Sequence, residues 1–332
     1  MEKELLVLGI ESTAHTLGFG VASSGGKILA NVNYTYRPRE GGIHPREAAQ
    51  HHSALAASGI AEAIREAGIK PKELDGIAFS AGPGMGPCLR VGATVARALA
   101  LKLDKPLIAV NHGVAHIEIG RLTTGCRDPV VLYVAGGNTL ITAYLEGRYR
   151  IFGETLDIAA GNCLDVFGIK AGIGPMPAPE ERAKLGEKLH PLPYRVKGMD
   201  VSFSGLLTAA LRMLKQGMKL EELCLSITET VYSMLTETVE RALAFTEKTE
   251  ILLVGGLARS RRLREMMDAM AKLHNAEVYA VPPKYAGDNG AMIAWTGVLQ
   301  LISGQVVSIE ESRVKPRYRI DEAEAIWRER EH

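Results

Sequence analysis

The chain has 332 residues, enough for two domains that each bury their own core, so a small disulfide-stapled protein is excluded. Hydrophobic residues make up 46% and charged residues 23%, the balance of an ordinary globular protein rather than of a disordered one. Lys and Arg number 39 against 38 Asp and Glu, and the net charge of +1 excludes a global attraction for nucleic acid. Any RNA partner must therefore be held by a local patch or with the help of other proteins.

The cysteines lie far apart and form no C-x-x-C pair, at positions Cys88, Cys126, Cys163 and Cys224. This spacing predicts neither a zinc cluster nor a disulfide framework and favours a reducing compartment. The short apolar run at 5–10 reaches Glu11 at once, and no run approaches the roughly 18 apolar residues of a membrane span. We therefore expect a cytoplasmic protein that is neither exported nor embedded in a membrane.

The N-terminal part of the chain predicts two strands on either side of a polar loop. The strands cover residues 5–10 and 17–22, and Glu-Ser-Thr-Ala-His-Thr at 11–16 forms the loop between them. The Gly-Pro-Gly-Met-Gly-Pro stretch at 82–87 predicts either a rigid bend or a ligand contact. Apolar residues recur at helical spacing over residues 45–68, 92–103 and 112–122.

The same order of strand, polar loop and strand recurs in the middle of the chain. Strands are predicted at 130–134 and 140–145 around the loop 135–139, and a third apolar strand at 251–254 ends in two glycines. Further helices are predicted at residues 205–216, 220–247, 261–273 and 289–302. This internal repeat predicts two duplicated α/β halves that face a shared cleft.

The predicted domain boundary lies near residues 123–128. We expect an N-terminal lobe over residues 1–125 and a C-terminal lobe over residues 126–304. Residues 305–332 could return to the N-terminal lobe. No low-complexity segment interrupts the chain.

His112 and His116 stand four residues apart on a predicted helix, and hence on one face of it. The spacing suits metal ligation from a helix, although histidines that cap or line a core helix are the commoner explanation of a bare H-x-x-x-H pattern. A metallopeptidase of the H-E-x-x-H type is disfavoured, because Gly113 offers no carboxylate beside the first histidine. Asp288, where another helix begins, could cap that helix or serve as a third ligand.

Glycine pairs follow two of the predicted strands, at Gly136–Gly137 and at Gly255–Gly256, where backbone amides can approach an anion closely. Each pair alone is more often a turn, but together with the first polar loop they favour a nucleotide held between two domains. Tyr133, just before the first pair, is typical of a core aromatic. Arginine-rich stretches at 259–264 and 313–319 could bind RNA phosphates, although solvated charged faces are commoner.

Several motifs together resemble one family. They are Glu11–Thr16, Ala81–Met85, Asn111-His112 with His116, Gly161–Asp165, Ser202–Leu206 and Asp288–Met292. Over essentially its whole length the chain resembles the universal tRNA threonylcarbamoyladenosine synthase family. Tyr133, Pro316–Arg319 and Trp327 are similar to its archaeal and eukaryotic branch, the catalytic subunit of the KEOPS complex.

The resemblance implies an α/β fold of the duplicated actin-like and sugar-kinase-like (ASKHA) class, with two lobes around a nucleotide cleft. It implies transfer of the threonylcarbamoyl group from threonylcarbamoyl-AMP to N6 of adenosine 37 in tRNAs that read ANN codons. The implied partners are the tRNA substrate and the other KEOPS subunits, a small atypical protein kinase and a small dimerising subunit, with no membrane. The alternative is an ATP-hydrolysing or non-catalytic nucleotide-binding subunit of the same assembly.

The resemblance also implies which residues form the site. One divalent metal, Fe²⁺ by the family pattern or alternatively Zn²⁺, would be held by His112, His116, Tyr133 and Asp288. Threonylcarbamoyl-AMP or ATP would be bound by Tyr133, Val134, Ala135, Gly136, Gly137, Asp165, Glu181 and Ser260. Glu11 is the nearest candidate for a general base, and a structural role in orienting its loop is equally open.

The chain departs from the family pattern at the nucleoside end of the site. Ala178 stands where a ribose-contacting glycine is expected, and the acidic partner is either Glu181 by a one-residue slip or is replaced by Arg182. Ser260 stands where the family has Asn. A mixed anhydride is already activated, so the enzyme has chiefly to align the adenine N6 with the carbonyl and to stabilise its growing charge.

Overall fold

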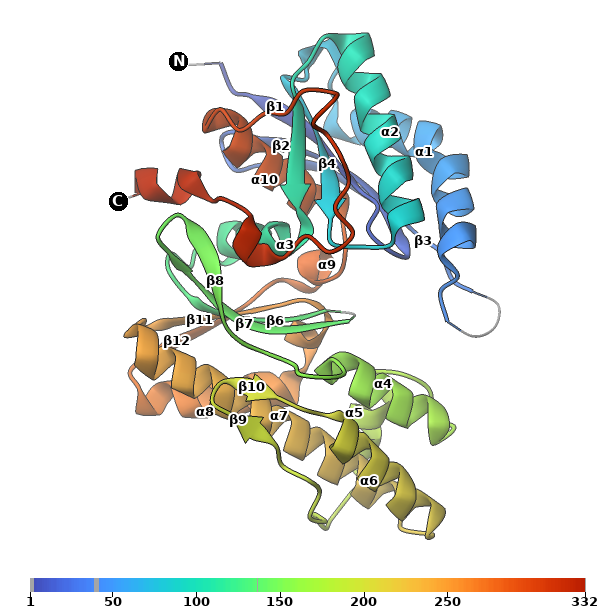
Figure 1. Ribbon diagram of the computed structural model, residues 1–332, viewed down its shortest axis with the longest axis vertical. Coiled ribbons are helices and arrows are strands. Elements are labelled where there is room, and N and C mark those ends of the chain that lie inside the picture. The colour runs from blue at the N-terminus through green and yellow to red at the C-terminus, as the bar shows by residue number, and fades with distance from the viewer. Residues whose placement is uncertain (1–2, 39–41, 136, 332) are drawn as a thin grey trace. The chain divides into compact units, whose positions relative to one another are not determined.

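The computed structural model describes residues 3–38, 42–135 and 137–331. The chain forms two compact units, each containing a five-stranded sheet (Figure 1). The first unit contains residues 1–123, 145–149 and 287–332. The second unit contains residues 124–144 and 150–286.

The sheet of the first unit has the strand order β3-β2-β1-β4-β5. Its strands are β1 (Leu6–Glu11), β2 (Thr16–Ser23), β3 (Ile28–Thr35), β4 (Gly76–Gly82) and β5 (Leu107–Asn111). Strand β2 pairs antiparallel with β1 and β3, whereas β4 runs parallel to β1 and β5. Every residue of β2 and β4 is buried, as expected for strands covered by helices on both faces.

Helices cover both faces of this sheet. Helices α1 (Pro45–Ala67) and α2 (Gly86–Leu103) lie on one face and α10 (Gly290–Ile302) on the other (Figure 1). Because side chains alternate along a strand, Phe19 of β2 packs against α1 while its neighbour Gly20 faces α10. A Cβ atom on Gly20 would lie 2.4 Å from the backbone nitrogen of Ala291, so only glycine lets the helix come this close.

Helix α3 (His112–Thr124) directly follows β5, and the chain after α10 runs back along the loop that ends β4. The backbone nitrogen of Lys315 donates to the carbonyl of Ala81 at 2.7 Å, and that of Gly84 donates to Pro316 at 3.1 Å. The C-terminal segment then forms short 3-10 turns at Ile320–Glu322 and Ile326–Glu331. The arginine-rich stretch 313–319 is irregular.

The compact units differ from the lobes expected from the sequence. Residues 287–304, expected in the C-terminal lobe, belong to the first unit because α10 packs on β1, β2 and β4. The first unit also includes residues 305–332, and its first segment ends at Thr123 rather than at residue 125.

The sheet of the second unit has the order β12-β11-β6-β7-β8. Its strands are β6 (Val130–Ala135), β7 (Asn138–Leu145), β8 (Arg148–Glu154), β11 (Glu250–Val254) and β12 (Glu277–Ala280). Strand β6 pairs antiparallel with β7, and β11 runs parallel to β6 and β12. A separate small ribbon joins β9 (Val196–Lys197) and β10 (Asp200–Val201).

The long helix α7 (Leu220–Thr246) is the centre of the helical layer of the second unit. It packs against α5, α6, α8 and strand β6. The other helices of this unit are α4 (Ala160–Lys170), α5 (Ala178–Ala183), α6 (Ser204–Lys215), α8 (Arg261–Leu273) and the short α9 (Pro283–Ala286).

Both sheets place three consecutive strands beside two parallel ones, which confirms the predicted duplicated α/β fold. Helix α2 begins at Gly86 rather than at residue 92, because Pro87 is tolerated in a first helical turn. The sequence patterns did not predict strands β3, β4, β5, β8 and β12 or helices α4 and α5. Among the described residues, no helix is both long and apolar enough to cross a membrane.

Candidate metal centre and nucleotide-binding residues

Asn111 determines where α3 begins. Its side-chain oxygen accepts hydrogen bonds from the backbone N–H groups of Gly113 (2.9 Å) and Val114 (3.1 Å), two donors that the helix cannot pair itself. Its amide nitrogen donates to the carbonyls of Tyr318 (3.3 Å) and Arg319 (3.1 Å), so the C-terminal segment fixes the cap. The first turn of α3 therefore has a defined orientation.

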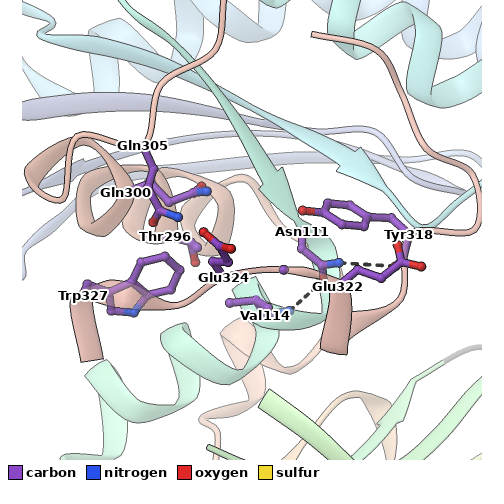
Figure 2. A pocket seen from close by; sticks show the side chains of 10 residues that line it. Asn111, Val114, Thr296, Gln300, Gln305, Tyr318, Glu322, Glu324 and Trp327 are labelled. Atoms are coloured by element: carbon purple, nitrogen blue, oxygen red, sulfur yellow. Dashed lines mark hydrogen bonds between the residues drawn. The ribbon is translucent and has the colours of Figure 1, made fainter. Parts of the chain in front are cut away.

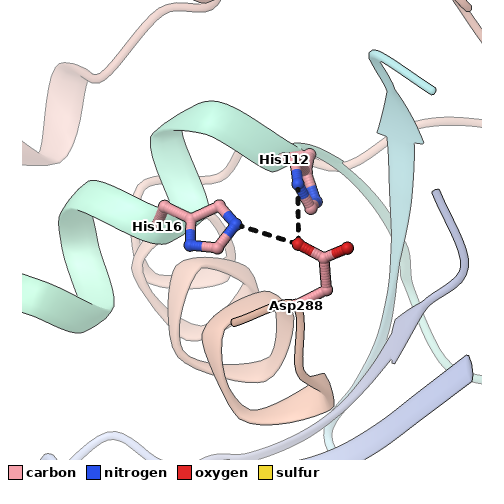
Figure 3. Close-up of side chains that lie close together, drawn as sticks. All are labelled: His112, His116 and Asp288. Atoms are coloured by element: carbon pink, nitrogen blue, oxygen red, sulfur yellow. Dashed lines mark hydrogen bonds and ion pairs between the residues drawn. The ribbon is translucent and has the colours of Figure 1, made fainter. Parts of the chain in front are cut away.

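His112, His116 and Asp288 come together within the first unit (Figure 3). One ligand atom from each residue lies within 4.8 Å of the other two. Asp288 Oδ1 lies 3.3 Å from His116 Nε2 and 3.5 Å from His112 Nε2. The histidines are only 6% and 1% exposed, so the cluster is screened from bulk water.

Asp288 is available to the histidines because its neighbour caps the following helix. Asn289 is the N-cap of α10, and its side-chain oxygen accepts a hydrogen bond from the backbone nitrogen of Met292 at 3.0 Å. The alternative in which Asp288 caps the helix is therefore wrong. The helix start instead directs the Asp288 carboxylate toward α3 (Figure 3).

Glu11 supports the cluster from strand β1. Its carboxylate is fully buried and accepts hydrogen bonds from the backbone nitrogen and the hydroxyl of Thr13. It also lies 3.0 Å from His112 Nδ1, and because an ionised carboxylate can only accept, Nδ1 carries the proton. The Nε2 atom of His112 is then left to face Asp288. This hydrogen-bond set favours the structural role of Glu11 over the predicted role of general base.

The charges of the cluster depend strongly on one another. Burial disfavours the imidazolium form of His112, but Glu11 and Asp288 outweigh burial and raise the pKa of His112 to about 10. Burial lowers the pKa of His116. The Asp288 carboxyl is largely removed from solvent, which raises its pKa, yet hydrogen bonds from the two histidines hold the pKa well below the usual value. A cation bound between these atoms would therefore compete with the proton on His112.

The donor set fits a metal ion. Two imidazole nitrogens and a carboxylate oxygen are ligands that Zn²⁺ and Fe²⁺ both accept, and a second carboxylate on the far ring nitrogen is the usual support for such a histidine. His15, in the same loop as Thr13, lies 4.0 Å from Asp288 Oδ2 with a side chain that is 44% exposed. His15 belongs to the motif Glu11–Thr16, but the sequence gives no sign of this contact because Asp288 lies far away along the chain.

The other predicted ligand and nucleotide contacts belong to the second unit. Tyr133 and Val134 are buried near the end of β6, Ala135 is its last residue, and Gly137 is exposed in the turn before β7. Gly136 was predicted to bind nucleotide and lies outside the described residues. Whether Tyr133 ligates the metal stays a prediction.

The ends of two parallel strands meet beside this loop. Gly255 follows β11 with a φ of +89°, a conformation that favours glycine. A Cβ atom at Gly255 would lie 2.3 Å from the carbonyl oxygen of Val134, so the two loops are in close contact. The carboxyl ends of parallel strands in α/β sheets are the usual place for a ligand.

Asp165 lies on α4 and is half-buried. Its carboxylate accepts a hydrogen bond from the backbone nitrogen of Met176 at 2.8 Å. Burial raises its pKa, against the opposing effect of that hydrogen bond. Asp165 therefore holds the segment that leads into α5.

Glu180, rather than the predicted Glu181, faces the interior of the second unit. Glu181 is exposed and pairs with Lys184. Glu180 accepts a hydrogen bond from the Tyr232 hydroxyl at 2.9 Å and lines a cavity of about 520 Å³ together with Arg262. Sequence reasoning missed Glu180 because the family motif does not fix the register of this short helix.

Ser260 is the N-cap of α8. Its hydroxyl accepts a hydrogen bond from the backbone nitrogen of Leu263 at 3.1 Å, and the residue is 7% exposed. Burial and the charge of Glu180 hold the pKa of Tyr232 well above its usual value, while a hydrogen bond with Ser260 lowers it. Ser260, Tyr232 and Glu180 therefore form one connected group.

Solved structures share this fold at low sequence identity. HypF of T. kodakarensis superposes with a TM-score of 0.66 at 16% identity, over 91% of this chain and 48% of that one. A ROK family glucokinase from Streptomyces griseus, solved with glucose and AMPPNP, has a TM-score of 0.51 at 11% identity, over 89% of this chain and 98% of that one. These likenesses support the duplicated ASKHA-type fold.

Relatives found by sequence comparison are far more similar to this chain. A tRNA N6-adenosine threonylcarbamoyltransferase of Thermofilum pendens is 57% identical over 331 residues, 99% of this chain and 98% of that protein. A probable bifunctional tRNA threonylcarbamoyladenosine biosynthesis protein of Methanothermobacter thermautotrophicus is 53% identical over 97% of this chain and 61% of that protein. The family model for tRNA N6-adenosine threonylcarbamoyltransferase matches residues 27–295. The chain therefore belongs to the tRNA N6-adenosine threonylcarbamoyltransferase family, whose members transfer a threonylcarbamoyl group to tRNA adenosine.

Proposed function

We propose that this chain transfers the threonylcarbamoyl group from threonylcarbamoyl-AMP to N6 of adenosine 37 in tRNAs that read ANN codons, and that this transfer depends on a divalent metal. The observation that carries the proposal is the buried cluster of His112, His116 and Asp288, whose ligand atoms lie within 4.8 Å of one another. These residues would hold the metal, with Tyr133 as a further ligand by resemblance. Iron or zinc bound there would supply Lewis acidity toward the phosphate or carbamoyl oxygens of the substrate.

The chain's own residues orient the ligands. Glu11 fixes the proton of His112 on Nδ1, so that Nε2 faces the ligand position. Asn111 fixes the first turn of α3, from which both histidines project. In this proposal Glu11 is a positioning residue and does not take the proton from the adenine amine.

The nucleotide end of the proposed site lies in the second unit. Backbone amides of Gly136 and Gly137 would hold the phosphate, Val134 and Ala135 would be further nucleotide contacts, and Asp165 would hold the segment beside them. We propose Glu180 in place of Glu181 as the acidic residue of this end, because Glu180 faces the cavity and Glu181 faces solvent. Ser260 would act through its hydrogen bonds with α8 and Tyr232.

The proposed setting is a cytoplasmic KEOPS assembly that contains a small atypical protein kinase and a small dimerising subunit. Several relatives carry names of bifunctional tRNA threonylcarbamoyladenosine biosynthesis proteins, and this chain matches 60–62% of the length of three of them. In those relatives a second activity is joined to the same chain. This supports the proposal that a separate partner protein supplies that activity to the present chain.

The test is a reconstituted reaction of this chain with threonylcarbamoyl-AMP, tRNA and the partner subunits. We expect modified adenosine with the wild type, and we expect His116→Ala to lower bound metal and transfer together. His274→Ala, which changes a histidine paired with Glu240 in the second unit, should leave both unchanged. Unchanged metal content in His116→Ala would contradict the metal assignment. ATP turnover without any tRNA modification would favour the ATP-hydrolysing alternative.

A further inference from the structure

A second polar cavity lies in the first unit and shares no lining residue with the metal cluster. It has a volume of about 180 Å³ and is lined by Asn111 and Val114, by two residues of α10, by Gln305, and by residues of the C-terminal segment between Tyr318 and Trp327 (Figure 2). The α10 residues are Thr296 and Gln300. Neither the metal cluster nor the nucleotide residues account for this cavity.

Three buried oxygen atoms on its wall have no hydrogen-bond partner in the described structure. They belong to Thr296, Gln300 and Gln305. Thr296 is only 1% exposed. The amide nitrogen of Gln300 donates to the carbonyl of Ala109 at 3.3 Å, which fixes the amide so that its oxygen faces away from that carbonyl. Figure 2 shows these three side chains gathered together, with the Glu324 carboxylate beside them.

The hydroxyl of Thr296 lacks a hydrogen bond that several other helical threonines among the described residues make, and the Thr228 hydroxyl on α7 lacks it as well. Thr208, Thr230 and Thr236 each donate their hydroxyl to the carbonyl four residues earlier, at 2.7–2.9 Å. Thr296 has the same option on α10 but lacks this bond. An unpaired buried hydroxyl costs free energy, so an external partner in the cavity is the natural explanation.

Two of the hydrogen-bond donors on the cavity wall are already used. The amide nitrogen of Asn111 donates to Tyr318 and Arg319, and the indole nitrogen of Trp327 donates to Glu118 at 3.1 Å. Two exposed carboxylates, Glu322 and Glu324, stand on the solvent side, and Glu324 also pairs with Arg148 at 2.9 Å. With three unpaired oxygens and two carboxylates on its wall, the cavity offers mainly acceptors, and its complement is a positively charged group with several donors.

We propose that this cavity binds the primary ammonium head of a small alkyl amine. An ammonium carries three N–H donors, which matches the three unpaired oxygens of Thr296, Gln300 and Gln305. The Trp327 ring gives an aromatic wall for the alkyl chain, and Glu322 would meet a second ammonium at the solvent side. A divalent metal fits less well, because the buried oxygens are neutral and hard cations favour carboxylates.

The test is a calorimetric titration of the full-length chain with 1,4-diaminobutane at constant ionic strength. The matched controls are tetramethylammonium, which has charge but no N–H, and KCl. We expect saturable binding of the diamine and no binding of either control. Since the chain has two Trp residues, Trp295→Phe leaves Trp327 as the only tryptophan, and the diamine should change its emission when tryptophan is excited selectively. Equal binding of tetramethylammonium or KCl, or no binding of the diamine, would overturn the proposal.

The variant Thr296→Val tests whether the diamine binds in this cavity. The variant keeps the side-chain shape and removes the unpaired hydroxyl, so without diamine it should unfold at the same or a higher temperature than the wild type. Its affinity for the diamine should fall roughly tenfold. Thr208→Val, in the second unit, is the control and should bind the diamine as the wild type does. Unchanged affinity in Thr296→Val would assign the binding to another place and refute the proposal.

Discussion

Glu11 shows how a motif residue can be recognised from the sequence while its role cannot. The motif places a carboxylate directly after a strand, and catalysis and loop support are equally consistent with that position. The positioning role that we propose rests on His112, 101 residues further along, whose Nδ1 lies 3.0 Å from the carboxylate. No local pattern contains that distance. The other carboxylate oxygen of the fully buried Glu11 accepts the hydrogen bonds from Thr13, so both oxygens have partners.

Replacement of Glu11 by Gln tests the positioning role. Glu11→Gln keeps the size of the side chain but removes its charge, so the support for the His112 ring weakens. We expect metal affinity to fall about 10–100-fold, as for other changes to groups that support a metal ligand. Competition with a chelator of known affinity measures this change. Glu4→Gln, which alters a contact with Ser23 in the same unit, is the control, and equal metal affinity in both variants would contradict the assignment.

The choice between Glu180 and Glu181 shows why sequence alone did not determine which side chain of α5 lines the cavity. Helix α5 has only six residues, too few for a periodic pattern that would fix its orientation. Neighbouring residues on a helix point about 100° apart, so a slip of one residue turns a side chain from the cavity to solvent. The H-x-x-x-H spacing lies on a longer helix and placed His112 and His116 on one face, whereas Asp288 joined them only through the family resemblance.

At the scale of the element, Ser260 contributes to the fold through the start of α8. Because its hydroxyl accepts a hydrogen bond from Leu263, Ser260→Ala should lower the free energy of unfolding by ~1 kcal/mol. Ser260→Asn should retain most of this stability, since Asn is an equally good cap. Urea unfolding of the three proteins measures the difference. An equal loss in both variants would show that the cap is not the stabilising contact.

Asp157 has a similar role at the start of α6. Its carboxylate accepts hydrogen bonds from the backbone nitrogens of Phe203 (2.8 Å) and Ser204 (3.1 Å) and from the hydroxyl of Ser202 (2.6 Å). The Ser-Phe-Ser motif in the sequence is therefore explained by the loop that it holds. Although its partial burial acts in the opposite direction, these bonds hold the pKa of Asp157 well below its usual range.

The depressed pKa of Asp157 predicts an acid-dependent contribution to stability. A carboxyl whose pKa is lower in the folded chain stabilises the fold fully above its unfolded pKa of about 3.9, and this contribution is lost as the pH falls toward the folded pKa. Asp157→Asn should therefore be less stable than the wild type at neutral pH, and the gap should narrow below about pH 4. The midpoints of urea unfolding, measured for both proteins between neutral pH and below about pH 4, give this difference in stability. A difference that stays constant with pH would refute the explanation.

At the scale of the whole molecule, the internal repeat made the architecture predictable, but it did not predict the place of α10. The two strand-loop-strand patterns are explicit in the sequence, and both sheets follow them. The surface that receives α10 is made of Gly9, Gly18 and Gly20, which carry no hydrophobic signal. The contact comes from close backbone approach, with Gly290 facing β2 from the helix side. A pattern of apolar residues cannot reveal such a surface.

The charge balance of the whole chain predicts how it binds tRNA. The net charge is +1, and the arginine-rich start of α8 is partly neutralised, because Arg261 pairs with Glu265 and Arg262 with Glu229. We expect the isolated chain to bind tRNA weakly and the assembled complex to bind it tightly, through phosphate contacts shared with the partner subunits. A complex that contacts about six phosphates loses on the order of a thousandfold in affinity between about 50 and 200 mM salt. Filter binding of the chain alone and of the complex across this range tests the expectation, and tight, salt-sensitive binding by the chain alone would contradict it.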